Sequence, residues 1–149
     1  MMAVVLNGCS AYDATDMTKM ASNKVADKAE RVEKLSAEIT SYSEFQDAEY
    51  DLFNVNGFSN SRQTLPGASS WDYKFVIKVK KADLDSWTAG MTELQLNGYD
   101  VSWTKDIIKP RQENWLTITE PKLFKREEAD VTVLVYEDEG VIFKRIIQH

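Results

Sequence analysis

The sequence predicts an α+β fold, a two-layer domain with a mostly antiparallel sheet of five to six strands. One long N-terminal helix and one further helix are expected on one face of that sheet. Two patterns predict this: apolar residues recur at helical spacing between residues 16 and 40, and they alternate with polar residues in several later segments. Clean alternation in two segments indicates that one face of the sheet meets water, so the helices should cover the other face.

The expected N-terminal helix runs from about residue 16 to about residue 40, with Thr15 or Asp16 as its cap. Its apolar stripe has a 4–3 spacing that is interrupted at Lys28. The stripe consists of Ala21, Val25, Val32, Leu35 and Ile39. We expect this stripe to pack on the domain's own sheet. A coiled-coil or partner-binding helix is the alternative, although three heptads with small residues at the seam are marginal for a coiled coil.

The rest of the chain is expected to be rich in strands. A strand over 49–55 ends at the turn Asn56-Gly57, a long loop covers 59–72, and alternation predicts a strand over 73–80. The helical spacing of Leu84, Trp87, Met91 and Leu94 predicts the second helix, with Gly98 as its C-terminal cap. Strands are then expected over 101–107 and 115–119, followed by a closing hairpin of 131–136 and 141–147 around residues 138–140.

Length and composition bound the classes of function. The chain has 149 residues and a formal net charge of -6, from 18 Lys and Arg against 24 Asp and Glu. This charge argues against a general nucleic-acid binder, so no nucleic-acid partner is predicted. There is one Cys and one His, and the His is the final residue, His149. The two together rule out a Cys–His zinc cluster and an internal disulfide, and they leave little support for catalysis by histidine.

No motif of the sequence points to a cofactor, a metal or a catalytic residue. It contains no Gly-x-Gly-x-x-Gly or Walker-type loop, no Gly-x-Ser-x-Gly and no Asp-x-Asp-x-Asp-Gly calcium loop. Neighbouring acids do occur, at Asp13 and Asp16, at Asp83 and Asp85, and at Glu127, Glu128 and Asp130. Two facing carboxylates are what glycoside hydrolysis requires, so a carboxylate-dependent hydrolase remains an alternative. Such clusters are more often solvated surface.

The amino terminus carries the most specific signal. Residues 1–10 form an uncharged, mostly apolar run that contains Leu6-Asn7-Gly8-Cys9. This segment resembles the lipobox of bacterial lipoproteins, in which a signal peptidase cuts before a Cys whose sulfur carries diacylglycerol. The resemblance implies a membrane anchor at Cys9, with palmitate or similar acyl chains, and concerns about ten residues. Ser10, in place of Asp, implies sorting to the outer membrane.

A basic block suggests a partner surface between residues 105 and 126. These 22 residues hold three acids, Asp106, Glu113 and Glu120. The cations of the block are Lys105, Lys109, Arg111, Lys122, Lys125 and Arg126. A local cationic excess suits an acidic protein partner or anionic lipid headgroups. The alternative interpretation is that these cations are solvated surface residues of an irregular connection around Pro110 and Pro121.

The sequence thus predicts a signal remnant and lipid-anchor tether over residues 1–15 and a single α+β domain over residues 16–149. The expected function is that of a lipid-anchored cell-envelope protein whose small, non-catalytic domain binds another protein. The expected location is the outer membrane, facing the periplasm or the cell surface. The alternatives are a hydrolase acting on envelope polysaccharide and an unanchored, cytoplasmic protein-binding module. The sequence leaves the partner and the oligomeric state undetermined.

Overall fold

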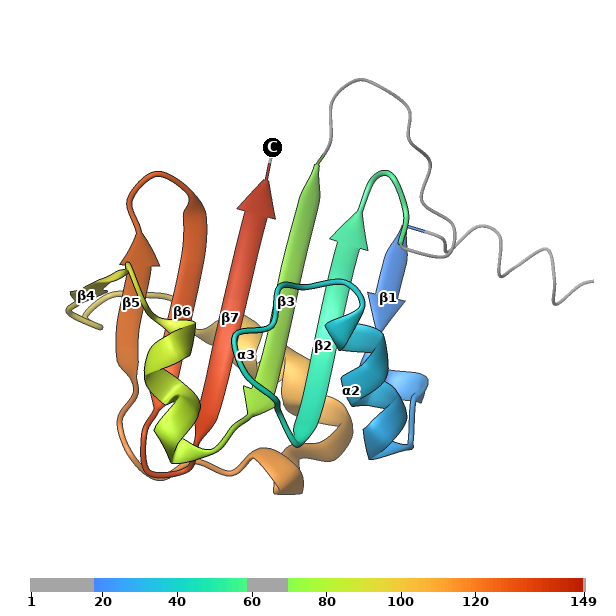
Figure 1. Cartoon of the computed structure of the whole chain (residues 1–149), viewed down its shortest axis with the longest axis horizontal. Coiled ribbons are helices and arrows are strands. Elements are labelled where there is room, and N and C mark those ends of the chain that lie inside the picture. The colour runs from blue at the N-terminus through green and yellow to red at the C-terminus, as the bar shows by residue number, and fades with distance from the viewer. Residues whose placement is uncertain (1–17, 59–69, 149) are drawn as a thin grey trace, which may run out of the picture.

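The computed structural model describes residues 18–58 and 70–148. Within these residues the chain forms a seven-stranded sheet in the order β1-β2-β3-β7-β6-β5-β4, antiparallel throughout (Figure 1). The strands are β1 (Lys19–Ala21), β2 (Asp47–Asn54), β3 (Trp71–Lys78), β4 (Thr92–Leu94), β5 (Lys122–Arg126), β6 (Asp130–Tyr136) and β7 (Val141–Gln148). The long strands β2, β3, β7 and β6 make the centre, and the three-residue strands β1 and β4 lie at the two ends.

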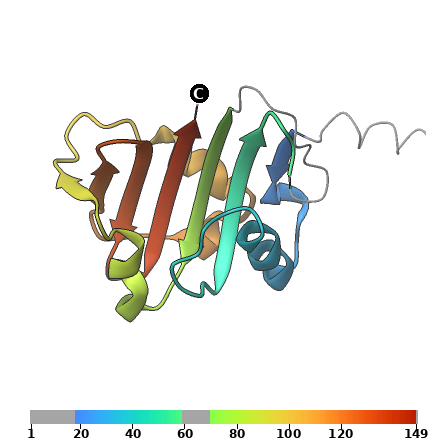
Figure 2. The same cartoon turned by 45° about the horizontal axis from the view of Figure 1, so that its top comes forward.

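Helices lie on both faces of this sheet. They are the 3-10 helices η1 (Ser22–Lys24), η2 (Lys81–Trp87) and η3 (Lys109–Trp115) and the α-helices α2 (Lys28–Ser36) and α3 (Ser102–Ile108). Figure 2 shows α2 in front of the sheet and α3 behind it. Two separate apolar clusters result, one under α2 and η2 around Leu35 and Trp87, the other under α3 and η3 around Trp103 and Trp115.

The predicted two-layer fold class is therefore wrong. The sheet has seven strands instead of five to six, residues 18–40 hold no helix longer than the nine residues of α2, and both faces of the sheet are covered. The strand over 71–78 shows why the alternation of apolar and polar residues wrongly predicted a sheet face exposed to water. Val76 is fully buried on the face that was expected to meet water. Lys78 lies on that same face and reaches the solvent boundary, where its Nζ donates to the Asn114 carbonyl oxygen at 3.0 Å. Long lysine side chains can line a covered face in this way.

The segment expected to be a long helix is divided into three elements. Residues 19–21 pair with 51–53 as a strand, residues 22–24 form η1, and α2 begins only at Lys28, where the apolar stripe is interrupted. Asp27 caps α2, because its side chain accepts a hydrogen bond from the Glu30 backbone N–H at 3.0 Å. Leu35 of α2 is fully buried on the domain's own sheet, as expected.

The segments between β3 and β5 also differ from expectation. Leu84 and Trp87 belong to the 3-10 helix η2, and a turn at Gly90, whose φ is +79°, separates η2 from strand β4. The expected strand over 101–107 is instead the helix α3. The pattern was ambiguous, because a spacing of four residues, as between Trp103 and Ile107, places two side chains on one face of a helix as well as on one face of a strand. The expected strand over 115–119 is absent.

The central strands agree with the sequence. The bounds of β2, β3, β6 and β7 lie within two residues of the predicted ranges, and β3 begins two residues early, inside the expected loop. The turn between β6 and β7 requires glycine, because Gly140 has a φ of +68° and an added Cβ would lie 2.5 Å from the Val79 carbonyl oxygen. The rest of the expected loop, 59–69, lies outside the described residues.

Candidate functional site

A buried charged network joins β2 to the helices at one end of the sheet. Its centre is Glu49, which is fully buried. Its Oε1 accepts hydrogen bonds from Ser22 Oγ at 2.5 Å and from Arg111 Nη1 at 2.7 Å. Its Oε2 accepts one from Trp115 Nε1 at 3.3 Å. Both oxygens of this carboxylate are thus engaged by protein donors.

Arg31 of α2 enters the same network from the other side. Its Nη2 donates to Asp47 Oδ1 at 2.9 Å, and its Nε donates to the Ala48 carbonyl oxygen at 2.9 Å. Its Nη1 donates to the carbonyl oxygens of residues 25 and 26 at 3.0 and 2.8 Å. Arg111 also donates from Nη2 to the carbonyl oxygen of residue 25, at 2.5 Å.

The network has the character of a structural support. Every nitrogen of Arg31 donates to a protein oxygen, and both oxygens of Glu49 accept. A buried charge is tolerated only when it is paired and hydrogen-bonded in this way. The cluster therefore ties η1, α2 and η3 to β2.

At the opposite end of the sheet lies β4, which like β1 is an edge strand among the described residues. β4 pairs with β5 on one side, with Thr92 opposite Lys125, Glu93 opposite Phe124 and Leu94 opposite Leu123. No strand of the described residues pairs with its other side, and all three residues of β4 are exposed. An edge strand of this kind presents unpaired backbone N–H and C=O groups to a second chain.

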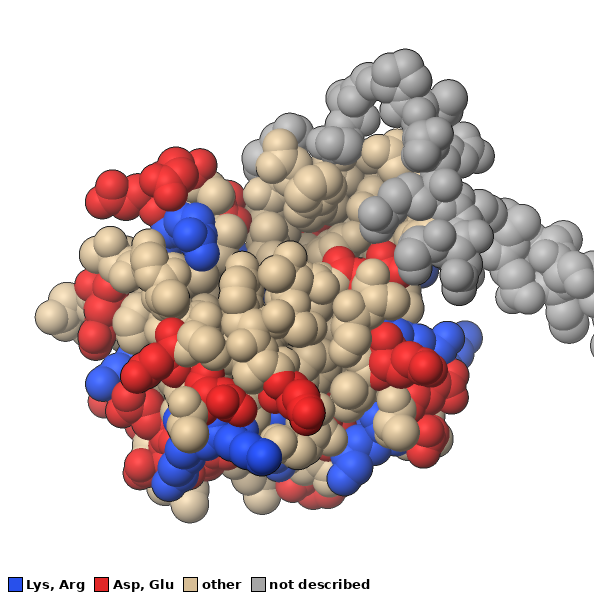
Figure 3. All heavy atoms as spheres, in the orientation of Figure 1, with Lys and Arg blue, Asp and Glu red and all other residues tan. Residues whose placement is uncertain are grey.

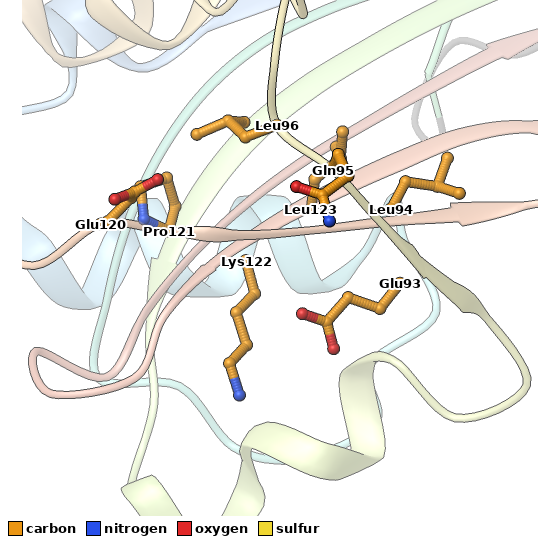
Figure 4. Close-up of a pocket in the computed structure, with 8 residues that line it drawn as sticks. All are labelled: Glu93, Leu94, Gln95, Leu96, Glu120, Pro121, Lys122 and Leu123. Carbon is orange, nitrogen blue, oxygen red and sulfur yellow. The ribbon is translucent and has the colours of Figure 1, made fainter.

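Two open hollows flank β4. The first, of about 540 Å³, is lined by Glu93, Leu94, Gln95, Leu96, Glu120, Pro121, Lys122 and Leu123. Figure 4 shows Glu93 and Lys122 on one side of β5, with Gln95 and Leu96 on the other. The second hollow, of about 590 Å³, is lined by Thr92, Leu94, Lys125, Arg126, Glu127, Glu128, Ala129 and Asp130. Leu94, at 45% exposed, lines both hollows.

A third feature is the extended segment 116–119, which leads toward β5. The side chains of Leu116 and Ile118 are 73% and 95% exposed. Glu139, in the β6–β7 turn, holds the segment: its Oε2 accepts from the Ile118 and Thr119 backbone N–H groups at 2.6 and 3.2 Å. These hydrogen bonds lower the pKa of the Glu139 carboxyl, and that of Ile118 N–H is the largest cause.

Lys144 of β7 is buried among aromatic side chains in the middle of the sheet. It is 5% exposed, and its Nζ lies 5.0 Å from the Tyr42 ring centroid and 5.8 Å from that of Trp87. Burial, with a smaller contribution from Arg126, lowers the pKa of Lys144 to about 8. The two rings partly replace lost hydration by cation–π attraction.

The predicted basic block is divided among three places. Lys122, Lys125 and Arg126 lie on β5 beside the open edge, Lys122 at the first hollow and the other two at the second. Lys105 and Lys109 are exposed on α3 and η3, behind the sheet. Arg111 lies in the buried network, with its side chain 16% exposed.

The acids noted in the sequence also separate. Asp83 and Asp85 lie on η2, and Glu127, Glu128 and Asp130 line the second hollow. Asp13, Asp16 and Cys9 lie outside the described residues. Sequence reasoning missed the buried acids Asp47 and Glu49. The available signal was their alternation with the apolar residues of β2, which places acids at regular positions in a strand.

The described part of the chain holds no group of three or more His, Cys, Asp or Glu residues arranged to bind a metal ion. Within those same residues, no helix combines the length and the apolar character needed to cross a membrane. Protein-family models, curated proteins and solved structures gave no match to this chain.

Proposed function

We propose that this protein is a non-catalytic accessory domain that binds another protein through β4 and is held at a bacterial envelope membrane by acylation of Cys9. The observation that carries the binding role is the open edge of β4, with all three residues exposed and a hollow on each side. Addition of a strand to an exposed sheet edge is a common way for proteins to bind extended peptides.

The buried charges support binding over hydrolysis. A carboxylate-dependent hydrolase needs a carboxyl group that can reach substrate and exchange a proton. Glu49 is fully buried with both oxygens bonded, and Asp47 is held by Arg31 and by the Ala48 backbone N–H at 2.7 Å. No feature of the described residues favours the hydrolase.

The membrane role rests on the sequence Leu6-Asn7-Gly8-Cys9 and its resemblance to a lipobox. Each acyl CH₂ that enters a bilayer contributes about 0.8 kcal/mol, so two or more chains make the attachment durable. With Ser10 after the cysteine, the proposed destination is the outer membrane. An acidic domain of net charge -6 has little attraction of its own to anionic lipids.

Fractionation of bacterial cells tests the anchor. The wild-type protein with its complete leader should sediment with membranes, leave them only in detergent, and carry diacylglycerol on an N-terminal cysteine. The Cys9→Ser variant should appear in the soluble fraction or as an uncleaved precursor. Equal solubility of the two proteins, with residues 1–8 intact in both, would contradict the anchor.

Site-specific photo-crosslinking in the host of origin tests the binding role. A photoreactive amino acid replaces Leu94 at the open edge or, as a matched control, Glu33, which is exposed on α2 at the other end of the sheet. We expect a discrete crosslinked protein from position 94 that position 33 does not give. Identical products at both positions, or none at position 94, would contradict binding through β4.

A further inference from the structure

Acidic residues outnumber basic ones around the open edge. The residues that line the two hollows include five acids and three bases. The acids are Glu93, Glu120, Glu127, Glu128 and Asp130, and the bases are Lys122, Lys125 and Arg126. Figure 3 shows Asp and Glu side chains along the left side of the molecule, over β4, β5 and the β5–β6 turn. The edge therefore lies in a locally negative surface.

Two of the three bases already have partners within the domain. Lys122 Nζ lies 3.2 Å from Glu137 Oε2, and this contact raises the pKa of Lys122. Lys125 Nζ lies over the Tyr99 ring, 5.8 Å from its centroid. Glu93, the middle residue of β4, forms no salt bridge with another described residue, although its charge adds to that of Glu137 in raising the pKa of Lys122. Its carboxylate is thus available to a residue on an added strand.

The position of Glu93 disfavours a second copy of this chain as the occupant. Two β4 edges paired antiparallel about their centres would place Glu93 of one copy opposite Glu93 of the other. Like charges at directly opposite positions destabilise a sheet. The net charge of -6 on each chain adds to the repulsion at low salt. The edge is accordingly protected against self-association.

The two faces of β4 differ in what they offer to a partner strand. Glu93 shares its face with Lys122 and Phe124, whereas Leu94 shares the opposite face with Leu123. Leu94, Leu96 and Leu123, with Pro121, supply apolar surface to the first hollow. Because side chains alternate along a strand, a partner can place a charge opposite Glu93 and an aliphatic group beside Leu94.

We propose that β4 accepts an extended segment of another protein in which a Lys or Arg faces Glu93 and the residues on either side of it are aliphatic. This inference rests on the proposed binding function and names the chemistry of its partner. The backbone of β4 provides the pairing, Glu93 selects the basic residue, and the hollow around Leu94 takes the aliphatic side chain.

The test uses two capped pentapeptides, Thr-Val-Lys-Val-Thr and Thr-Val-Glu-Val-Thr, titrated into the isotopically labelled full chain while amide NMR shifts are recorded. The Lys peptide should shift the amides of β4 and bind about three- to tenfold more tightly than the Glu peptide. Glu93→Lys should reverse this preference. Glu33→Lys, an equal charge change on α2, should leave it unaltered.

The outcomes separate this inference from the proposed function. Equal binding of the two peptides, or a preference that Glu93→Lys does not reverse, would overturn the basic partner strand. If position 94 still gives its crosslink in cells, the binding function stands without the charge preference. Failure of that crosslink overturns the binding function itself, whatever the peptides do.

Discussion

The two ends of the sheet place glutamates in opposite circumstances. Glu49 of β2 is fully buried and accepts hydrogen bonds from Ser22, Arg111 and Trp115. Glu93 of β4 is exposed on a strand that has no second partner among the described residues. Both are glutamates in strands, so residue type and secondary structure do not determine their roles. Burial and the available donors do: Glu49 is enclosed by its hydrogen-bond donors, whereas Glu93 lies exposed on an edge strand.

The first prediction concerns the largest expected difference between the ends. Glu49→Gln removes the buried negative charge that lies 3.7 Å from Arg31 Nε and 2.7 Å from Arg111 Nη1. It should lower the free energy of unfolding by about 3–5 kcal/mol. Glu93→Gln, at the open end, should change it by less than about 0.5 kcal/mol. Urea unfolding of both variants measures the difference. Similar losses would contradict the contrast between an enclosed Glu49 and an exposed Glu93.

Lys144 extends the comparison to a buried cation beside aromatic rings. Its pKa is about 8 in the folded protein, against an ordinary value of 10.5, so between these pH values the unfolded chain binds more protons. The free energy of unfolding should therefore rise from pH 8 to pH 10.5. Below pH 8 the folded protein bears the full cost of burying the charged ammonium group of Lys144. Lys144→Met should raise stability at pH 7, by at most about 1.4 kcal/mol per unit of pKa shift. Unfolding curves at pH 7 and pH 9.5 measure this, and a wild type equally stable at both would contradict it.

Tyr50 is a buried polar group that lacks a partner. Its hydroxyl has no hydrogen bond within the described residues, and burial raises its pKa to about 12. Above pH 10 the unfolded chain ionises first, so the wild type should lose stability toward pH 12. Tyr50→Phe should raise the free energy of unfolding by about 1 kcal/mol at pH 7 and weaken the alkaline loss. A destabilised Tyr50→Phe variant would show that the hydroxyl does have a partner.

The smallest effect is expected at Glu139, which holds the segment 116–119 next to the open end. Glu139→Gln should speed amide exchange at residues 118 and 119 and leave the melting temperature nearly unchanged. Because the pKa of Glu139 is lowered, its contribution is present above the ordinary value of 4.5 and is lost as pH falls through the folded value. Exchange rates at pH 6 that match the wild type would contradict this role.

The sequence predicted the central strands because their signals are local. Alternation located β2 and β3, and the acidic turn before Gly140 located the β6–β7 hairpin. The helices were harder, because the spacing of Trp103 and Ile107 fits a strand and a helix equally well. The stripe from Ala21 to Ile39 joined a strand, a 3-10 helix and an α-helix into one false element, although Lys28 marked the true start of α2.

The two ends of the sheet were less accessible to sequence reasoning, because each depends on distant residues. Glu49 meets Arg111 across 62 positions of the chain, and no local pattern encodes that contact. β4 has three residues and becomes a strand only by pairing with residues 123–125. Three cations of the basic block, Lys122, Lys125 and Arg126, lie beside the open edge because they belong to the one strand β5, and the other three lie elsewhere.

Native-state hydrogen exchange tests most directly whether the edge strand β4 is open while the strand that carries Glu49 is enclosed. The amides of β2 around Glu49 should exchange only through global unfolding, with the same free energy that urea unfolding gives. The amides of β4 should exchange through local opening, at a much smaller free energy that depends little on denaturant. If β4 is protected as strongly as β2, the edge is not open and the proposed binding surface is wrong.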